Sequence, residues 1–243
     1  MSRILVTGSA DGLGRLAAAS LIADGHTLVV HARNPDRASS LAPLTGQGAK
    51  LVIADLADRE AVTRLASELS ADEPLDAVIH NADVWSGRAV MPVNIVAPYL
   101  LTALVPLPRR VIYLSSGSHY GGRPSTQRVD WQGRGAGSYE DSKLFVTALM
   151  AAVARRRPDV LSNAVDPGWV PTRMGGPSAP DDLEEGHRTQ EWLATSEDAQ
   201  AATTGGYWYH RERRQPHESV PDEAFQHQLL RALAAETGVE LDL

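Results

Sequence analysis

Short apolar runs alternate along most of the chain with longer stretches in which apolar residues recur at helical spacing. The apolar runs predict strands at residues 4–7, 27–32, 50–54, 75–80, 109–114, 160–165 and 206–209. The other stretches predict helices at residues 15–23, 35–44, 58–69, 139–157, 196–202 and 222–237, and one within 85–104 that Pro98 should kink. Strands that alternate with helices are joined by right-handed crossovers into a parallel sheet. We therefore expect one α/β domain over residues 1–243, a doubly wound seven-stranded parallel sheet with helices on both faces.

The first predicted strand runs into a glycine-rich turn, and a helical stretch follows it. This order of elements is the usual setting of a phosphate-binding turn, because the free backbone N–H groups of a helix N-terminus attract anions. Gly8 permits the tight turn, Gly12 lets the backbone approach a pyrophosphate, and Gly14 lets helix and strand pack closely. A plain turn between strand and helix is the alternative interpretation.

The second predicted strand ends at Arg33-Asn34, where a dinucleotide-binding sheet meets the adenosine ribose. NAD-binding proteins usually place an acid there, whereas an Arg can accept a 2′-phosphate, so Arg33 favours NADP over NAD. Arg37 could add to that preference, and Asp11 in the glycine turn would oppose it. Asp55, just past the third strand, could bind an adenine amine or cap the next helix.

Tyr139 and Lys143 are four residues apart on a predicted helix, so their side chains lie one above the other. An ammonium in that position stabilises the phenolate and lowers the tyrosine pKa, which makes a general acid and base for neutral pH. The chain has 21 Arg but only two Lys, and a lysine kept here indicates a need for a compact point charge. An ordinary helix start with an exposed lysine is the alternative.

Two long polar segments interrupt the pattern, an inserted loop at 117–138 and a Pro/Gly/Asp-rich lobe at 173–195 that we expect to cover a substrate. Large apolar residues lie on loops or near strand ends, which favours an apolar substrate, although some of them could simply close the core. They are Trp85, Trp131, Trp169, Met174 and Trp192.

Composition excludes several other classes of protein. The net charge of −7 argues against a nucleic-acid or anionic-membrane partner, and the absence of Cys excludes disulfides and thiolate metal sites. The eight His show no zinc-ligand spacing, so we expect no metal. The most apolar region, 89–107, is too short and too interrupted by Pro to span a bilayer, and a strand already starts at the N-terminus. We expect a cytoplasmic protein.

The ordered set of motifs resembles the short-chain dehydrogenases/reductases, which have a Rossmann fold. The match covers nearly the whole chain, and each motif is weak alone while the ordered set is specific. The matching residues are Thr7-Gly8-x-x-x-Gly12-x-Gly14, Asp55-Leu56, Asn81-Ala82, Asn94, Ser116, Tyr139-x-x-x-Lys143 and Pro167-Gly168.

The resemblance implies a role for each residue. Tyr139 would exchange a proton with a carbonyl or alcohol oxygen that Ser116 holds, with Ser115 as the less favoured rival. Lys143 would bind the nicotinamide ribose, and the Asn94 backbone would hold a water that leads from Lys143 to solvent. The implied NADP-binding residues are Gly8, Ser9, Asp11, Gly12, Leu13, Gly14, Arg33, Asp55, Leu56, Asn81, Ala82, Tyr139, Lys143, Pro167, Gly168, Val170 and Thr172.

Two departures from the family pattern stand out. Asp83 replaces the glycine usual after Asn-Ala, which would alter the backbone beside the adenosine. Ser116 and Tyr139 are 23 residues apart, as in the retinol-dehydrogenase-like and WW-domain-oxidoreductase-like subgroup. The resemblance implies an NADP-dependent oxidoreductase for an aldehyde, ketone or alcohol, assembled as a homodimer or homotetramer. The alternatives are a non-catalytic NADP-binding regulatory protein, or a dehydratase or isomerase without net cofactor turnover.

Overall fold

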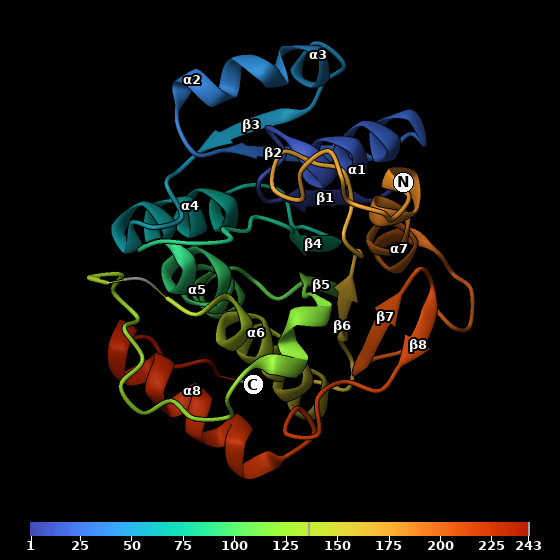
Figure 1. Cartoon of the computed structure of the whole chain (residues 1–243). Coiled ribbons are helices and arrows are strands. Elements are labelled where there is room, and N and C mark those ends of the chain that lie inside the picture. Colours follow the sequence, from blue (N-terminus) through green and yellow to red (C-terminus); the bar gives the residue numbers. More distant parts are fainter. Residues whose placement is uncertain (136, 243) are drawn as a thin grey trace.

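A computed structural model describes residues 1–135 and 137–242 of the chain. Its centre is an eight-stranded sheet in the order β3-β2-β1-β4-β5-β6-β7-β8 (Figure 1). The pairs from β3 to β7 are parallel, and β7 with β8 is antiparallel. The strands are β1 Arg3–Val6, β2 Thr27–Ala32, β3 Lys50–Ile53, β4 Ala77–His80, β5 Arg110–Leu114, β6 Leu161–Asp166, β7 Gly206–Tyr209 and β8 Glu212–Arg214.

Helices cover both faces of this sheet. In Figure 1, α1 and α7 lie on one side, and α4, α5 and α6 lie on the other, with α8 outside α6. The helices are α1 Gly12–Ala23, α2 Pro35–Ala38, α3 Ala42–Thr45, α4 Arg59–Ala71, α5 Ala97–Leu104, α6 Tyr139–Arg156, α7 Leu183–Thr195 and α8 Glu223–Thr237. Shorter helical segments are η1 Ser39–Leu41, η2 Pro92–Val96 and η3 Gly117–Gly121.

The sheet separates two apolar clusters, because side chains alternate across each strand. In β1, Leu5 faces the cluster under α4, α5 and α6, while Ile4 and Val6 face the cluster under α1 and α7. The doubly wound single-domain architecture predicted from the sequence is therefore confirmed. The carboxyl ends of β1, β4, β5 and β6 meet at one edge, where such sheets place their ligands.

The predicted seven-stranded sheet is wrong in its strand number, because β8 adds an eighth, antiparallel strand. β8 is Glu-Arg-Arg with all of its residues exposed, so no apolar pattern marks it. It follows a tight turn in which His210 and Arg211 both have positive φ, 49° and 63°. A hairpin turn of this kind reverses the chain without a Gly or Asn to signal it.

Three of the predicted helices also differ from the observed ones. Residues 196–198 have no regular structure and 199–202 form turns, although the sequence predicted a helix there. The stretch at 35–44 breaks into α2, η1 and α3, with Asn34 as the expected cap and Pro35 at the first helical position. The kink expected at Pro98 is a π-helical segment instead, η2, which runs directly into α5. Such segments concentrate at functional sites.

The C-terminal helix α8 packs against α6. An alanine-rich face of α6, made of Ala148, Ala151 and Ala152, would permit close packing against another copy of the chain. Ala148 and Ala152 are buried within the chain itself, and Ala151 is half-buried against the apolar cluster to which they belong. This cluster also contains Phe225 and Leu229 of α8. The assembly into a homodimer or homotetramer stays a prediction, but this alanine face does not support it.

Candidate active site

The glycine turn packs directly against the end of β4. A Cβ on Gly8, whose φ is +69°, would lie 2.9 Å from the Ala82 Cα, and one on Gly14 would lie 2.3 Å from Asn81 Nδ2. Thr7 Oγ1 accepts hydrogen bonds from the backbone N–H groups of Asn81 and Ala82, at 2.9 and 3.0 Å. Gly8 therefore has the positive φ of the tight turn expected of it, Gly14 has the close packing expected of it, and Thr7 fixes the two strand ends together.

Gly12, whose φ is +52°, stands opposite Thr172 from the loop after β6. A Cβ at Gly12 would have Thr172 Cγ2 as its nearest neighbour, at an ordinary contact distance of 3.6 Å. Asp11 caps α1, and its carboxylate accepts from the Gly12 N–H at 2.9 Å. The turn and the β6 loop therefore face each other.

The residues expected around the adenosine lie at the end of β2 and β3. Arg33 is exposed and makes no hydrogen bond or ion pair within residues 1–135 and 137–242. Arg37 pairs with Asp11 at 2.8 Å, and the hydrogen bond from Arg37 holds the pKa of that carboxyl below its usual range. Asp55 accepts from the Ala57 N–H at 2.9 Å in the turn before α4, whereas the cap of α4 is Asp58, so the capping role considered for Asp55 is wrong.

Ser9 and Leu56 contribute from inside the fold. Both are buried, and the Ser9 hydroxyl accepts from the His31 N–H at 3.1 Å and donates to the Val6 carbonyl. The Ser9 hydroxyl is therefore used by the fold itself. Any contact of Ser9 with a phosphate would come from its backbone, which is how glycine turns usually bind anions.

Tyr139 and Lys143 meet at a third residue, Asp83. Tyr139 Oη donates to Asp83 Oδ2 at 2.9 Å, and Lys143 Nζ lies 2.9 Å from the same oxygen. Lys143 Nζ also donates to the Leu114 carbonyl at 2.9 Å and lies 5.3 Å from the centre of the Tyr139 ring. Ser138 caps the helix that carries the pair, with its Oγ accepting from the Asp141 N–H at 3.1 Å.

The electrostatics of Tyr139 are the reverse of what its spacing from Lys143 predicted. Burial raises the pKa of the phenol far above its usual range, and the negative charge of Asp83 and the hydrogen bond to it act in the same direction. The nearby Ser116 hydroxyl lowers the pKa by less, and the charge of Asp166 raises it. The expected lowering of the pKa fails first because the phenol is buried, and second because Asp83 brings a negative charge beside it and pairs with the Lys143 ammonium.

The structure separates the two adjacent serines after β5. Ser115 is fully buried and hydrogen-bonded to Thr147 Oγ1 at 2.7 Å. Ser116 is half-buried, caps η3 through a bond from the Ser118 N–H at 3.1 Å, and is near enough to Tyr139 to influence the phenol pKa. Ser116 is therefore the serine that can reach a ligand oxygen beside Tyr139.

Asn94 holds the loop after β4 in place. Its Oδ1 accepts from the Val84 N–H and its Nδ2 donates to the Val84 carbonyl, both at 2.9 Å. Its Nδ2 also lies 3.1 Å from Ser142 Oγ on α6. The buried side chain thus fixes the segment that carries Asp83 against the helix that carries Tyr139, and the backbone role implied by the resemblance stays a prediction.

Hydrogen bonds and close packing hold the loop after β6 in a defined conformation. Gly168 has a φ of +81°, and a Cβ there would lie 2.6 Å from the Asp181 carboxylate, which accepts from the Trp169 N–H. The Thr172 N–H donates to the Val170 carbonyl at 2.7 Å. Pro167 leads this loop out of the sheet, and Val170 is buried.

The predicted lobe at 173–195 divides into this loop and a packed helix, α7. Gly186 allows α7 to approach closely, because a Cβ there would lie 2.8 Å from Val170 and 3.2 Å from Leu13. Leu13 itself is buried at the start of α1. Residues 183–195 therefore belong to the core of the fold, and substrate covering by the remaining loop stays a prediction.

The inserted loop at 117–138 packs against α6 and α8 over its described residues. Trp131 is buried, and its ring centre lies 5.5 Å from that of Phe145 on α6. Arg123 pairs with Asp141 at 2.9 Å, and Gln228 of α8 donates to Thr126 at 3.0 Å. The insertion is thus tied to the helix that carries Tyr139; Ala136 lies outside the described residues.

Large apolar side chains gather at the carboxyl edge of the sheet. Trp85 is 55% exposed, and its ring centre lies 4.5 Å from that of Tyr139. Trp169 and Met174 are also exposed, at 60% and 47%, whereas Trp131 is in the core and Trp192 packs on Trp208. Trp85, Trp169 and Met174 are the members of the predicted apolar set that remain available to a ligand.

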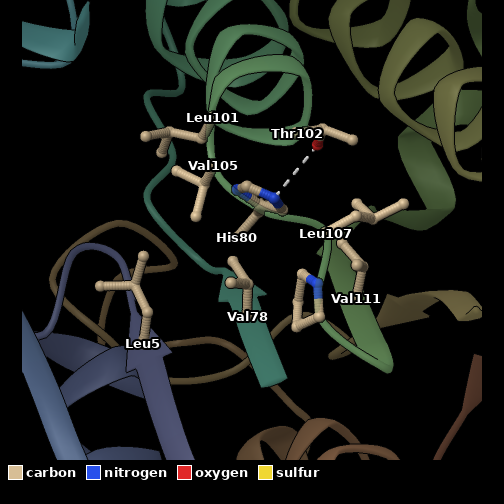
Figure 2. Close-up of a pocket in the computed structure, with 9 residues that line it drawn as sticks. Leu5, Val78, His80, Leu101, Thr102, Val105, Leu107 and Val111 are labelled. Carbon is tan, nitrogen blue, oxygen red and sulfur yellow. Dashed lines mark hydrogen bonds between the residues drawn. The ribbon is translucent and has the colours of Figure 1, made fainter. Parts of the chain in front are cut away.

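A small cavity elsewhere in the molecule is a packing gap and no active site. Figure 2 shows it under α5, lined by apolar residues and by His80, which faces Thr102 at 3.5 Å. Burial lowers the pKa of His80 to about 3, so this histidine is neutral at physiological pH. The cavity contains none of the predicted site residues.

The described residues contain neither a candidate metal site nor a candidate membrane-spanning helix. Among the described residues, no group of three or more His, Cys, Asp or Glu side chains could hold a metal ion. No helix in that part of the chain is long and apolar enough to cross a membrane.

Comparison with known proteins connects this geometry to a group of enzymes. The KR domain family matches residues 2–94. The short-chain dehydrogenase chry4 of Gibberella zeae is 37% identical over 257 aligned positions, which cover 99% of each chain. Retinol dehydrogenase 13 of Homo sapiens is 26% identical over 71% of this chain and 60% of its own. A short-chain dehydrogenase of Shigella flexneri, complexed with NADP, has a TM-score of 0.69 and 26% identity, covering 87% of this chain and 97% of its own.

Sequence reasoning named Tyr139, Lys143, Ser116 and Asn94, and the structure adds partners that it did not foresee, above all the contacts of Asp83. Asp83 was recognised as a departure from the family pattern, but its effect was expected at the adenosine, and the structure places it on Tyr139 and Lys143. The available signal was chemical: a carboxylate where a glycine is usual, just past a central strand, brings a charge to the edge where ligands bind.

Proposed function

The chain belongs to the short-chain dehydrogenase/reductase family, and on that premise we propose that it is an NADP(H)-dependent oxidoreductase that interconverts a carbonyl compound and an alcohol. The observation that carries the proposal is that Tyr139 and Lys143 lie together at the carboxyl edge of the sheet, with Lys143 Nζ 5.3 Å from the centre of the Tyr139 ring. Ser116 lies beside them, and the glycine turn packs against the same strand ends.

The residues around this edge suit a nicotinamide dinucleotide. The turn at Gly8, Gly12 and Gly14 would hold the pyrophosphate, and Lys143 would hold the nicotinamide ribose. Two buried oxygens without a hydrogen-bond partner among the described residues, Asn81 Oδ1 and Asp83 Oδ1, lie beside this turn at the end of β4 and can accept from ligand hydroxyls. When bound, the cofactor would supply the hydride.

Within this proposal the protein's own groups handle the proton. In reduction, the phenol of Tyr139 gives its proton to the carbonyl oxygen, and the Ser116 hydroxyl donates a hydrogen bond to that oxygen. In alcohol oxidation, the Tyr139 phenolate takes the hydroxyl proton. Asn94 holds the loop after β4 against the helix α6, which keeps Tyr139 in place for this proton exchange.

We infer a preference for NADP from Arg33. Its guanidinium is exposed at the end of β2 and has no partner in the described chain, so it can accept a 2′-phosphate. Arg37 is a weaker candidate because Asp11 already pairs with it. The Shigella relative in complex with NADP supports the same choice.

The exposed apolar side chains support an apolar substrate. Trp85 packs on the Tyr139 ring, and Trp169 and Met174 extend from the loop after β6. An apolar molecule that reached Tyr139 Oη would remove part of this surface from water, which is favourable in proportion to the area buried. The human relative's name, retinol dehydrogenase 13, fits an alcohol or aldehyde of this class.

Oxidation of NADPH in the presence of a panel of apolar aldehydes and ketones tests the proposal. The wild type should consume NADPH, and Tyr139→Phe, which keeps the ring and removes the proton, should lose about 10²–10⁴-fold in kcat. Equal turnover by the two proteins would rule out Tyr139 as the acid.

A second function is favoured by one observation, the contact of Asp83 with both Tyr139 and Lys143. If Tyr139 and Lys143 stayed bound to Asp83, the site would bind NADP without turning it over, as a regulatory protein does. Isothermal titration with NADP separates the two functions: binding together with no NADPH consumption across the whole panel would favour the regulatory protein.

A further inference from the structure

Asp83 is placed to control the proton on Tyr139. It follows Asn81-Ala82 at the end of β4, and its side chain is only 10% exposed. Its Oδ2 accepts from Tyr139 Oη and pairs with Lys143 Nζ, each at 2.9 Å, while its Oδ1 is buried without a partner among the described residues. No other carboxylate in the described chain is hydrogen-bonded to Tyr139.

This contact has two chemical consequences. A phenol has a single proton, and while it donates to Asp83 it cannot donate to a ligand oxygen. A phenolate would also lie 2.9 Å from a carboxylate in a site with little water to screen the two charges, which disfavours the charged form.

The other charged groups around the phenol do not cancel this effect. Lys143 on α6 favours the phenolate, but its ammonium is already paired with Asp83 and hydrogen-bonded to the Leu114 carbonyl. Asp166 at the end of β6 adds a second negative charge that raises the phenol pKa. From the end of β5, Ser116 offers a hydroxyl but no charge, and Asp141 on α6 is paired with Arg123.

We propose, building on the oxidoreductase function above, that Asp83 is a positioning residue that keeps Tyr139 protonated and moves the alcohol-oxidation reaction of this enzyme to alkaline pH. Oxidation needs the phenolate to accept the hydroxyl proton, so it proceeds only in the fraction of molecules that have lost the phenol proton. Neutralising the carboxylate lowers the cost of forming that phenolate.

The first test measures Tyr139 directly and needs neither cofactor nor turnover. Protein labelled with ¹³C at the tyrosine ring is titrated by NMR, and the Tyr139 signal is assigned by its loss in Tyr139→Phe. In the wild type the signal should not titrate up to pH 10. In Asp83→Asn, which keeps an acceptor of similar shape, the midpoint should fall by about one to three pH units.

The second test follows alcohol oxidation by kcat/KM as a function of pH. The midpoint of the alkaline rise should move to lower pH in Asp83→Asn and in Asp83→Gly. Glu60→Gln is the matched control, because it removes one negative charge from a side chain on α4 that is 88% exposed. Its profile should coincide with that of the wild type, and thermal unfolding should show that all variants are folded.

The two tests separate this inference from the proposed function. An inactive chain whose Tyr139 signal moves in Asp83→Asn would keep the role of Asp83 and remove the oxidoreductase function. An active chain whose Tyr139 midpoint and pH profile stay unchanged in Asp83→Asn would overturn the role of Asp83. A uniform loss of rate at every pH, with an unmoved midpoint, would also overturn it, because that is the behaviour of a merely structural residue.

Discussion

Single residues of the site differ sharply in how available their polar atoms are, and the serine pair after β5 shows this best. The Ser115 hydroxyl is buried on Thr147, whereas the half-buried Ser116 influences the phenol of Tyr139. We expect Ser116→Ala to lower kcat by about 10²-fold, since removal of one oxyanion donor typically has that effect. Steady-state kinetics of the two single variants measures it.

Ser115→Ala is the matched control for that prediction. It removes one buried hydrogen bond, so it should cost about 1 kcal/mol of the free energy of unfolding and leave kcat close to the wild-type value. A large loss of kcat in Ser115→Ala, with Ser116→Ala near wild type, would reverse the assignment of the two serines.

Arg33 is the residue on which the choice of cofactor depends. Because its guanidinium has no partner in the described chain, it is available for a charge-assisted hydrogen bond to a 2′-phosphate. Arg33→Ala should raise the Kd for NADP about tenfold or more and leave the Kd for NAD nearly unchanged, since such a bond contributes roughly 1.5–3 kcal/mol. Calorimetric titration with both cofactors measures the two constants.

Arg37→Ala serves as the comparison variant, because Arg37 is already paired with Asp11. It should change the Kd for NADP less than Arg33→Ala does. A larger effect of Arg37→Ala than of Arg33→Ala would move the 2′-phosphate contact from Arg33 to Arg37.

At the scale of elements, the inserted loop is part of the core through Trp131. Its indole is 8% exposed and packs on Phe145 of α6, the helix that carries Tyr139. Trp131→Ala should therefore lower the free energy of unfolding by about 3–5 kcal/mol, as deletions of buried aromatic side chains do. Urea unfolding followed by circular dichroism measures the change.

Trp85→Ala is the matched control, because Trp85 is 55% exposed. Its loss should cost under about 1 kcal/mol of stability, the usual range for surface substitutions, even though it removes the ring packed on Tyr139. Equal destabilisation by both variants would contradict the placement of the insertion in the core.

The pattern of apolar residues predicted the helices and strands whose apolar side chains pack into the core. β2 Thr27–Ala32 was predicted at its observed bounds, and the helix predicted at 222–237 is α8, Glu223–Thr237, with Asp222 as its cap. β8 was missed because an exposed edge strand of three charged residues has no apolar period. The helix expected at 196–202 was wrong, because alanines in a short segment favour a helix that the tertiary structure does not form.

The site was predictable where function depends on spacing along one element, and less so where elements meet. Tyr139 and Lys143 were found because they share one helix face. The direction of the Tyr139 pKa was missed, since it depends on the burial of the phenol and then on Asp83, which comes from a different strand end and contacts both side chains only after folding. Spacing along the chain contains no information on that contact.

For the whole molecule, buried neutral histidines make the stability of the fold depend on pH. Burial lowers the pKa of His80 to about 3, and burial also lowers the pKa of His31 and His119. In the unfolded chain such a histidine takes up a proton near its ordinary pKa of about 6.5. Between these two values the unfolded state binds the extra proton, so the free energy of unfolding falls as the pH falls.

His80→Phe isolates the contribution of one histidine to this slope, because it keeps a ring to stack on Tyr113, whose ring centre lies 4.9 Å from that of His80. Between about pH 6 and pH 4, the unfolding free energy of the wild type should fall more steeply than that of the variant, by about 1.4 kcal/mol per pH unit. Urea unfolding at closely spaced pH values gives both slopes. Acidic groups such as Asp11, whose pKa is lowered by Arg37, add the same slope to both proteins and cancel in the difference. If the two proteins had equal slopes, His80 would be protonated in the folded state. A water or a rearranged Thr102 would then have to accept a hydrogen bond from His80 Nδ1, which has no partner in the described structure.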